Sequence, residues 1–128
     1  MIVGLATLIA IYIAFVAKQF LCDFLLQTTW MARGKERSAG WLRPLAAHVG
    51  IHAAGTLAIA LVAAPQFWFL ALVDIAVHGC IDRGKALASR GTPPTEPRFW
   101  WLLGADQALH QLTHFAYVLL LAGVVRPG

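Results

Sequence analysis

Charged residues are scarce in this chain of 128 residues. Only 12% of them are charged and 59% are hydrophobic, whereas a soluble domain of ordinary composition carries about 25% charge. The net charge is +4, but the basic residues cluster in short segments between apolar blocks and are not interleaved with aromatic residues along one face. This distribution argues against nucleic-acid binding and favours a membrane protein whose basic loops set its orientation.

Several catalytic signatures are also missing. The sequence has no glycine-rich phosphate loop, no nucleotide fingerprint and no serine in a recognisable nucleophile setting. Cys22 and Cys80, its only cysteines, lie inside apolar blocks, which predicts reduced packing residues and not a disulfide. The first apolar block lacks a positive n-region and a small-residue cleavage site, so we expect a helix there and not a signal peptide.

Four apolar blocks account for most of the chain. A helix that crosses a bilayer needs roughly 20 apolar residues, and the blocks predict helices at about 2–30, 41–63, 66–87 and 99–125. Loops 31–40 and 88–98 connect the first pair and the last pair. The predicted fold class is therefore all-α: a polytopic four-transmembrane-helix bundle that forms a single domain over residues 1–128.

The charges of the loops predict the orientation of the bundle. Loop residues on the cytoplasmic side carry an excess of Lys and Arg, and the turn between the second and third helices has no charge at all. We therefore expect both long loops to be cytoplasmic and both termini to lie outside. The basic residues that support this orientation are Arg33, Lys35, Arg37, Arg43, Arg83, Lys85, Arg90 and Arg98.

Polar residues inside the apolar blocks recur at a spacing of four. Residues i, i+4 and i+8 lie on one side of a helix, so each block presents a ladder of polar side chains. All five histidines and all four aspartates of the chain belong to these ladders. The ladders are Gln19, Asp23 and Gln27; His48 and His52; Asp74, His78 and Asp82; and Asp106, His110 and His114.

Counting from the cytoplasmic helix ends, at about 1.5 Å per residue, places these residues at common depths. A shallow layer is rich in carboxylates, a middle layer holds three histidines, and a deeper layer includes a lysine. The predicted layers are Asp23, His48, Asp82 and Asp106; Gln19, His52, His78 and His110; and Lys18, Asp74 and His114.

This convergence predicts a divalent metal site. An aspartate at the centre of a membrane helix costs about 2.5–3.5 kcal/mol on insertion scales, so several of them need inward-facing partners. Imidazole nitrogen and carboxylate oxygen suit zinc, and similar pairs on bundle helices hold iron or manganese. We expect one or two metals per chain, with zinc favoured. The candidate ligands are His48, His52, Asp74, His78, Asp82, Asp106, His110 and His114.

The remaining polar residues receive other roles. An aspartate that does not bind metal would act as general base, and the candidates are Asp23, Asp82 and Asp106. Lys18, Gln19, Gln27, Gln107 and Gln111 are candidates for orienting the ligands or contacting substrate. The sequence does not determine the oligomeric state, and a homo-oligomer is compatible with it.

At these ladders the sequence resembles a family of bacterial inner-membrane proteins, domain of unknown function 3307. The matching stretches are 18–27, 44–52, 74–85 and 104–114, which together span nearly the whole chain. The resemblance implies a multi-pass protein of the bacterial inner (cytoplasmic) membrane but brings no function with it. The histidine and aspartate pattern is also similar to that of small membrane-bound metal-dependent hydrolases, which implies a reaction type but no substrate.

These observations predict a metal-dependent hydrolase that acts near the cytoplasmic leaflet. The substrate would be a membrane lipid or lipid-linked ester, amide or phosphoester, and basic loop residues would attract an anionic headgroup. Two alternatives remain open from the sequence. The same ladders could relay protons or transport a metal ion, or they could form a structural metal site in a membrane complex.

Overall fold

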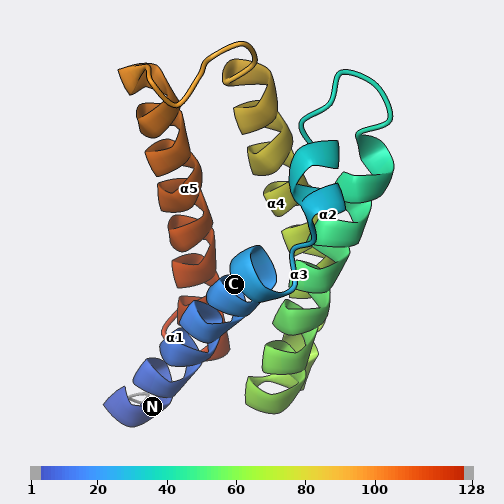
Figure 1. Cartoon of the computed structure of the whole chain (residues 1–128). Coiled ribbons are helices and arrows are strands. Elements are labelled where there is room, and N and C mark those ends of the chain that lie inside the picture. The colour runs from blue at the N-terminus through green and yellow to red at the C-terminus, as the bar shows by residue number, and fades with distance from the viewer. Residues whose placement is uncertain (1–3, 126–128) are drawn as a thin grey trace.

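The computed structural model describes residues 4–125, and its regular elements in that range are all helical (Figure 1). This confirms the predicted all-α class for the described residues. Residues 1–3 and 126–128, where the first predicted helix begins and the tail lies, are outside that range. The elements are α1 (Leu5–Phe20), the π-helical segment η1 (Leu21–Leu25), α2 (Thr29–Gly34), α3 (Leu42–Ala63), the 3₁₀ turn η2 (Pro65–Phe67), α4 (Leu70–Ala88) and α5 (Pro97–Leu121).

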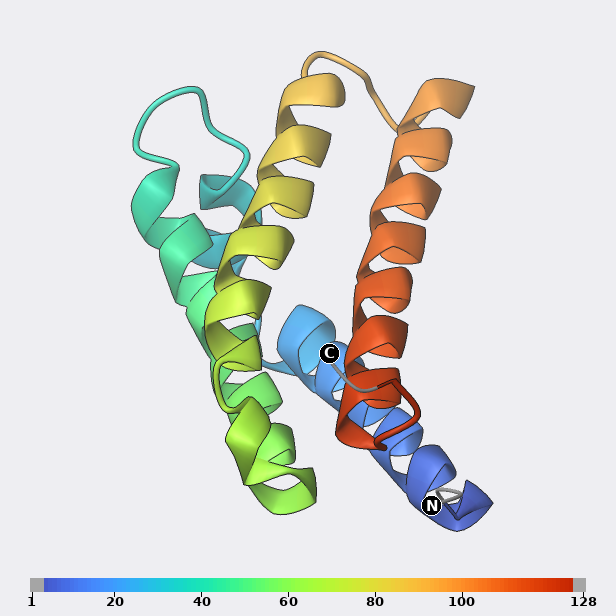
Figure 2. The same ribbon diagram turned by 180° about the vertical axis from the view of Figure 1, so that it is seen from behind.

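The long helices α3 and α4 form an antiparallel hairpin, α5 packs beside α4, and α1 crosses both α3 and α5. Figures 1 and 2 show the connections 35–41 and 89–96 at one end of the molecule, which we call the loop end. The start of α1, the turn η2 and the end of α5 lie at the opposite end, which we call the turn end. The two long connections therefore share one end, as the sequence predicts, although no membrane defines which side that end faces.

The prediction of one continuous helix over 2–30 is wrong. The helix ends in η1, where the Leu26 N–H bonds to the Leu21 carbonyl at 2.8 Å, a π-type i to i−5 bond. Gln27 then donates from Nε2 to the Asp23 carbonyl at 2.9 Å, and Thr28 caps the new helix α2 by accepting from the Met31 N–H. Side chains thus satisfy backbone groups that a continuous helix would pair internally.

The other predicted boundaries shift by a few residues. A 3₁₀ turn occupies 65–67, so α4 begins at Leu70 and not at residue 66, and α5 covers Pro97–Leu121 and not 99–125. The predicted loop 31–40 begins later because α2 continues to Gly34. A Cβ atom on Gly34 would lie 2.4 Å from Pro44 Cγ, so only glycine lets α2 pack this closely on α3.

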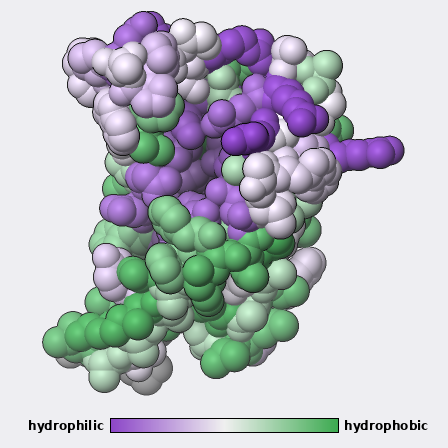
Figure 3. Space-filling model, in the orientation of Figure 1, coloured by the Kyte–Doolittle hydropathy of each residue, from purple (hydrophilic) through white to green (hydrophobic). Residues whose placement is uncertain are grey.

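The apolar core fills the turn end. Phe15 of α1 and Val118 of α5 are among its most completely buried side chains. The polar ladders lie between this core and the loop end, and Figure 3 shows hydrophilic side chains gathered in a hollow in the upper half above a largely hydrophobic lower half. The core consists of Ile11, Phe15, Ala60, Ala64, Leu70, Tyr117, Val118, Leu121 and Ala122.

Two helical stretches of the described chain, Leu5–Leu25 and Leu42–Ala63, are long and apolar enough to cross a membrane by length and composition. Helices α4 and α5 do not pass this test because their polar and charged residues lower the mean hydropathy, and the four predicted spans stay a prediction. Large apolar side chains also remain exposed across the surface, including Val62 at 89%, Trp101 at 72% and Leu5 at 70%. Exposed apolar surface on this scale indicates contact with lipid or a partner.

Candidate metal centre

Four histidines from three helices meet in the loop half of the bundle. His48 and His52 come from α3, His78 from α4 and His110 from α5, and all four are buried. The ring centroid of His78 lies 3.9 Å from that of His52 and 4.0 Å from that of His110. The rings of His48 and His52 are 4.8 Å apart. These helices therefore place their imidazoles in one contiguous stack.

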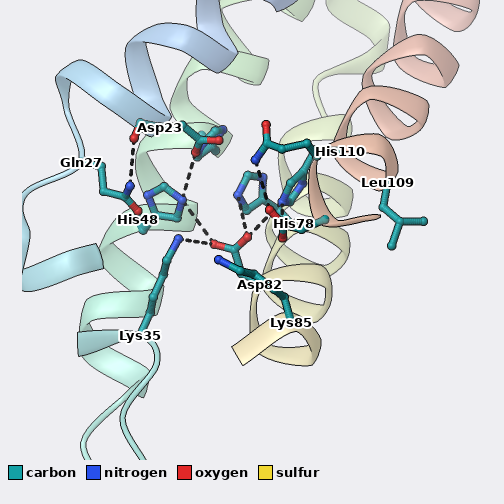
Figure 4. A network of polar contacts seen from close by, with 12 residues as sticks. Asp23, Gln27, Lys35, His48, His78, Asp82, Lys85, Leu109 and His110 are labelled. Atoms are coloured by element: carbon teal, nitrogen blue, oxygen red, sulfur yellow. Dashed lines mark hydrogen bonds and ion pairs between the residues drawn. The ribbon is translucent and has the colours of Figure 1, made fainter. Parts of the chain in front are cut away.

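Two aspartates approach this stack from opposite sides. Asp23 Oδ1 lies 2.7 Å from His52 Nε2 and 3.3 Å from His48 Nε2. Asp82 Oδ1 lies 3.0 Å from His110 Nε2, and its Oδ2 lies 3.3 Å from His48 Nε2 (Figure 4). Asp82 Oδ1 also lies 3.6 Å from His78 Nε2, so Asp23 faces two imidazoles, Asp82 faces three, and His48 faces both carboxylates.

A third aspartate stands at the edge of the group. Asp106 Oδ1 lies 3.4 Å from His110 Nε2, and Asp106 Oδ2 accepts a hydrogen bond from Gln107 Nε2 at 3.1 Å. We call the whole set of seven residues the histidine–aspartate cluster. Its members are Asp23, His48, His52, His78, Asp82, Asp106 and His110.

Within this cluster, two sets of ligand atoms lie close enough together to hold an ion. One set comes from Asp23, His48, His52 and His78, and the other comes from His78, Asp82 and His110; within each set the atoms lie within 4.8 Å of one another. His78 belongs to both sets, so the two positions would adjoin. Asp106 belongs to neither, although it contacts His110.

Several polar atoms of the cluster are buried without a hydrogen-bond partner in the described part of the chain. Both ring nitrogens of His48 and of His78 are among them, together with His52 Nδ1 and Asp106 Oδ1. A buried polar atom without a partner costs about 1–3 kcal/mol. These atoms fit a metal or its bound water, because ligand formation would satisfy them.

The charges of the cluster also favour a bound metal ion. Three carboxylates face one nearby cation, Lys35, whose Nζ lies 2.9 Å from Asp82 Oδ2. With neutral imidazoles, this leaves an excess of two negative charges in a buried environment. A divalent cation would neutralise that excess, and a set of imidazole nitrogens and carboxylate oxygens suits zinc, iron or manganese.

Lys35 is the residue of this site that the ladders miss. It stands at the C-cap of α2, outside any apolar block, and sequence reasoning treats it as an orientation signal. Figure 4 shows its side chain reaching from the loop end to Asp82. Arg83 of α4 donates hydrogen bonds to the carbonyls of Lys35 and Arg37, at 3.4 and 3.1 Å. These bonds hold the connection after α2 against α4. No spacing rule relates Lys35 to the ladders.

Most of the predicted supporting glutamines contact the cluster. Gln19 donates from Nε2 to Asp23 Oδ2, Gln27 donates to the Asp23 carbonyl, and Gln107 donates to Asp106. Gln111 instead lines a groove between α1 and α5. The sequence therefore identified the residues that hold two of the three aspartates.

Asp74 and His114, which the sequence nominates as metal ligands, lie in a second group one level nearer the turn end. Lys18 Nζ lies 2.9 Å from Asp74 Oδ2 and 3.1 Å from His114 Nε2. Thr56 donates to Asp74 Oδ2 at 2.7 Å, and the Tyr117 hydroxyl lies 3.4 Å from Asp74 Oδ1. We call these five residues the lysine–aspartate cluster. Its ammonium group already occupies the position of a cation.

The two cysteines are free, as predicted. Cys22 is buried in η1, whereas Cys80 is exposed on α4. Neither cysteine belongs to the ligand sets found among the described residues. The candidate metal centre is therefore built from nitrogen and oxygen donors.

Comparison with known proteins adds the family and no chemistry. No curated protein and no solved structure matches the chain. The family described as "Protein of unknown function (DUF3307)" matches residues 11–126, a range that includes every residue of both clusters. Because the match covers most of the chain, the chain belongs to the DUF3307 family.

Proposed function

We propose that this protein is a membrane-embedded, metal-dependent hydrolase whose centre is the histidine–aspartate cluster. The observation that carries the proposal is the group of three carboxylates that meets one ammonium beside imidazole nitrogens that lack partners in the described chain. A bundle of apolar helices gains nothing by gathering such groups unless a cation joins them. The two adjoining sets of ligand atoms support one or two divalent ions, with zinc favoured.

The membrane placement is part of the proposal. The four long helices would cross the bacterial inner membrane, with the loop end at the cytoplasmic surface and both termini outside. The exposed apolar side chains and the two helices that pass the length and composition test support this placement. The basic residues Arg33, Arg37 and Arg43 near the loop end are exposed and would attract an anionic headgroup.

The residues of the cluster would have different roles in hydrolysis. His48, His52, His78, Asp23, Asp82 and His110 would hold the metal. A bound metal lowers the pKa of water and polarises a carbonyl or phosphoryl group. The Gln19 side chain would fix Asp23, and the Lys35 ammonium would hold Asp82 or, once the metal neutralises that carboxylate, face an anionic substrate.

Asp106 is the best-placed general base. It lies outside both ligand sets, and its Oδ1 is buried without a partner beside His110. It would take a proton from the attacking water, whose oxygen bonds to the acyl carbon or phosphorus. The bond to the leaving group then breaks, and the leaving group takes up the proton. The substrate would be a lipid or lipid-linked ester, amide or phosphoester.

Elemental analysis of the protein purified in mild detergent tests the proposal first. We expect one or two zinc, iron or manganese ions per chain, and loss of the ion held by His78, Asp82 and His110 in His110→Ala. Asp106→Asn should keep the metal but slow lipid hydrolysis by about 10²–10⁴-fold, the usual contribution of a general base. Release of product from phosphatidylglycerol vesicles, followed by mass spectrometry, measures that rate. Wild-type protein that stays free of metal after reloading would contradict the proposal.

A transporter or proton relay is the alternative function. The lysine–aspartate cluster favours it, because it extends the polar ladders one level toward the turn end. The apolar core weighs against it, because buried residues such as Phe15, Val118 and Leu121 follow directly below. Metal or proton flux into vesicles that contain the purified protein, with no hydrolysis of their lipids, would favour this alternative.

A further inference from the structure

A groove runs between α1 and α5 on the outer face of the bundle. Its volume is about 570 Å³, within the range of small-molecule sites. Buried Phe15 and His114 form its floor, while its walls carry exposed apolar side chains. Further residues that line it are Tyr12, Val16, Gln19, Phe20, Ala108 and Leu112.

Polar side chains line the middle of the groove, between apolar residues on either side. Gln19 is one of them, with Phe20 and Phe24 following it along the chain, and it also donates to Asp23 of the histidine–aspartate cluster. The Oε1 atom of Gln19 is buried without a partner in the described chain, so it can accept a hydrogen bond from a ligand. Tyr12 and Phe115 line the part near the turn end. An occupant would therefore have a polar group beside the cluster and an apolar tail away from it.

The dimensions favour a thin occupant. Residues 12–24 of α1 and η1 extend for about 18 Å at 1.5 Å per residue, similar to half of the roughly 30 Å hydrocarbon core. A single acyl chain is long, narrow and apolar, as the groove requires.

We infer that this groove binds one acyl chain of the lipid substrate and positions the headgroup beside Gln19 and Asp23. This inference rests on the proposed function, since it assumes that the loop half of the bundle lies in one leaflet. It assigns the substrate class: an anionic lipid with a hydroxyl or N–H donor close to the headgroup. The donor would bond to Gln19 Oε1, and the basic residues of the loop end would face the negative charge.

Photocrosslinking tests the assignment. The protein is placed in phosphatidylglycerol vesicles that contain a trace of phosphatidylglycerol with a diazirine on one acyl chain, and labelled peptides are mapped after irradiation. We expect the labels on groove residues such as Val16, Phe20 and Leu112. Equal labelling of exposed residues on α4, such as Leu72 and Ile75, would overturn the inference.

Substitutions then separate binding in the groove from general contact with lipid. Ala108→Phe fills the groove and should reduce its labelling by about tenfold or more. Ala54→Phe adds the same bulk to an exposed position of α3 outside the groove and should change nothing. Leu112→Trp gives a second blocking variant, and an unchanged metal content identifies variants that are folded. Labelling that persists in both blocked variants would overturn the inference, as would crosslinks between two protein chains in place of lipid.

His110→Ala distinguishes this inference from the proposed function. His110 is not among the residues that line the groove, so this variant should keep the groove labelling while losing hydrolysis and the metal of its own ligand set. Groove labelling in a wild-type protein without hydrolysis would leave the acyl-chain site standing and refute the hydrolase. Hydrolysis by a protein whose labels are scattered over its surface would support the hydrolase and refute the acyl-chain site.

Discussion

The two polar clusters of this protein lie one level apart and differ in how their buried charges are balanced. In the lysine–aspartate cluster one carboxylate meets one ammonium, and Thr56 adds a hydrogen bond to Asp74. None of the buried side-chain atoms that lack partners in the described chain belongs to it. In the histidine–aspartate cluster three carboxylates meet one ammonium, and several ring nitrogens are left without partners.

The difference separates a structural group from a binding site. Both clusters contain histidine and aspartate at helical spacing, so residue type alone does not distinguish them. The lysine–aspartate cluster is balanced by its own cation, and its neutralised pair contributes hydrogen bonds where α1, α3, α4 and α5 meet. The histidine–aspartate cluster needs two further positive charges, which a divalent ion would supply.

Replacing the histidine shared by both ligand sets should have the largest effect on this contrast. His78→Ala removes one ligand from each set, so we expect the metal content to fall from one or two ions per chain to none. His114→Gln is the matched control, since His114 belongs to the balanced cluster and should not affect the metal. Elemental analysis of both purified variants measures the outcome. Equal metal loss in the two variants would show that the clusters act as one site.

Lys18→Met should have the opposite profile. Removing one member of a buried ion pair typically costs about 3–5 kcal/mol, because the remaining charge loses its partner. We therefore expect a large drop in thermal stability in detergent, while protein that is still folded retains its metal.

The double variant Lys18→Met with Asp74→Asn is the control for that loss. Asparagine carries no charge and keeps one oxygen that can accept from Thr56, while its NH2 group can donate to the Tyr117 hydroxyl, so most of the stability should return. If the double variant is as unstable as Lys18→Met alone, the ion pair is not the source of the effect.

The sequence predicted the depth of these residues better than their partners. Counting along four helices placed His52, His78 and His110 at one level, and their rings do stack. It also placed Asp74 with Lys18 and His114. Spacing of four residues fixes both the face and the height of a side chain on a straight helix. It does not reveal which groups are already neutralised, so Asp74 and His114 appeared equivalent to the other ligand candidates.

The errors concentrate where the chain leaves a straight helix. The turn from η1 into α2 depends on hydrogen bonds of Gln27 and Thr28. Because these two polar residues stand among many apolar ones, the mean hydropathy of the block hides the turn. Lys35 reaches Asp82 only because α2 folds back toward α3, and no periodic pattern encodes that contact. The groove between α1 and α5 is likewise a product of helix crossing and not of sequence spacing.

Gln19→Leu should have an intermediate effect and refine the contrast within the metal centre. Gln19 holds Asp23 Oδ2, and loss of such a supporting hydrogen bond typically weakens metal affinity by about 10–100-fold. Gln111→Leu is the matched control, because Gln111 lines the groove and is not among the residues of either ligand set. Competition with a calibrated chelator measures both affinities. Identical affinities would mean that Asp23 needs no support or binds no metal.

The smallest expected effect concerns the break that separates α1 from α2. Thr28 Oγ1 accepts from the Met31 N–H, and loss of such a cap usually costs about 0.5–2 kcal/mol. Thr28→Ala should therefore lower thermal stability slightly, whereas Thr29→Ala, one residue inside the helix, should not. Because α2 carries Lys35 at its C-cap, fraying of α2 should also loosen the contact with Asp82 and raise the local negative charge. Metal affinity in Thr28→Ala, measured beside stability, then reports whether the α2 connection contributes to the site. A loss of stability with unchanged affinity would show that Lys35 finds Asp82 without an ordered helix behind it.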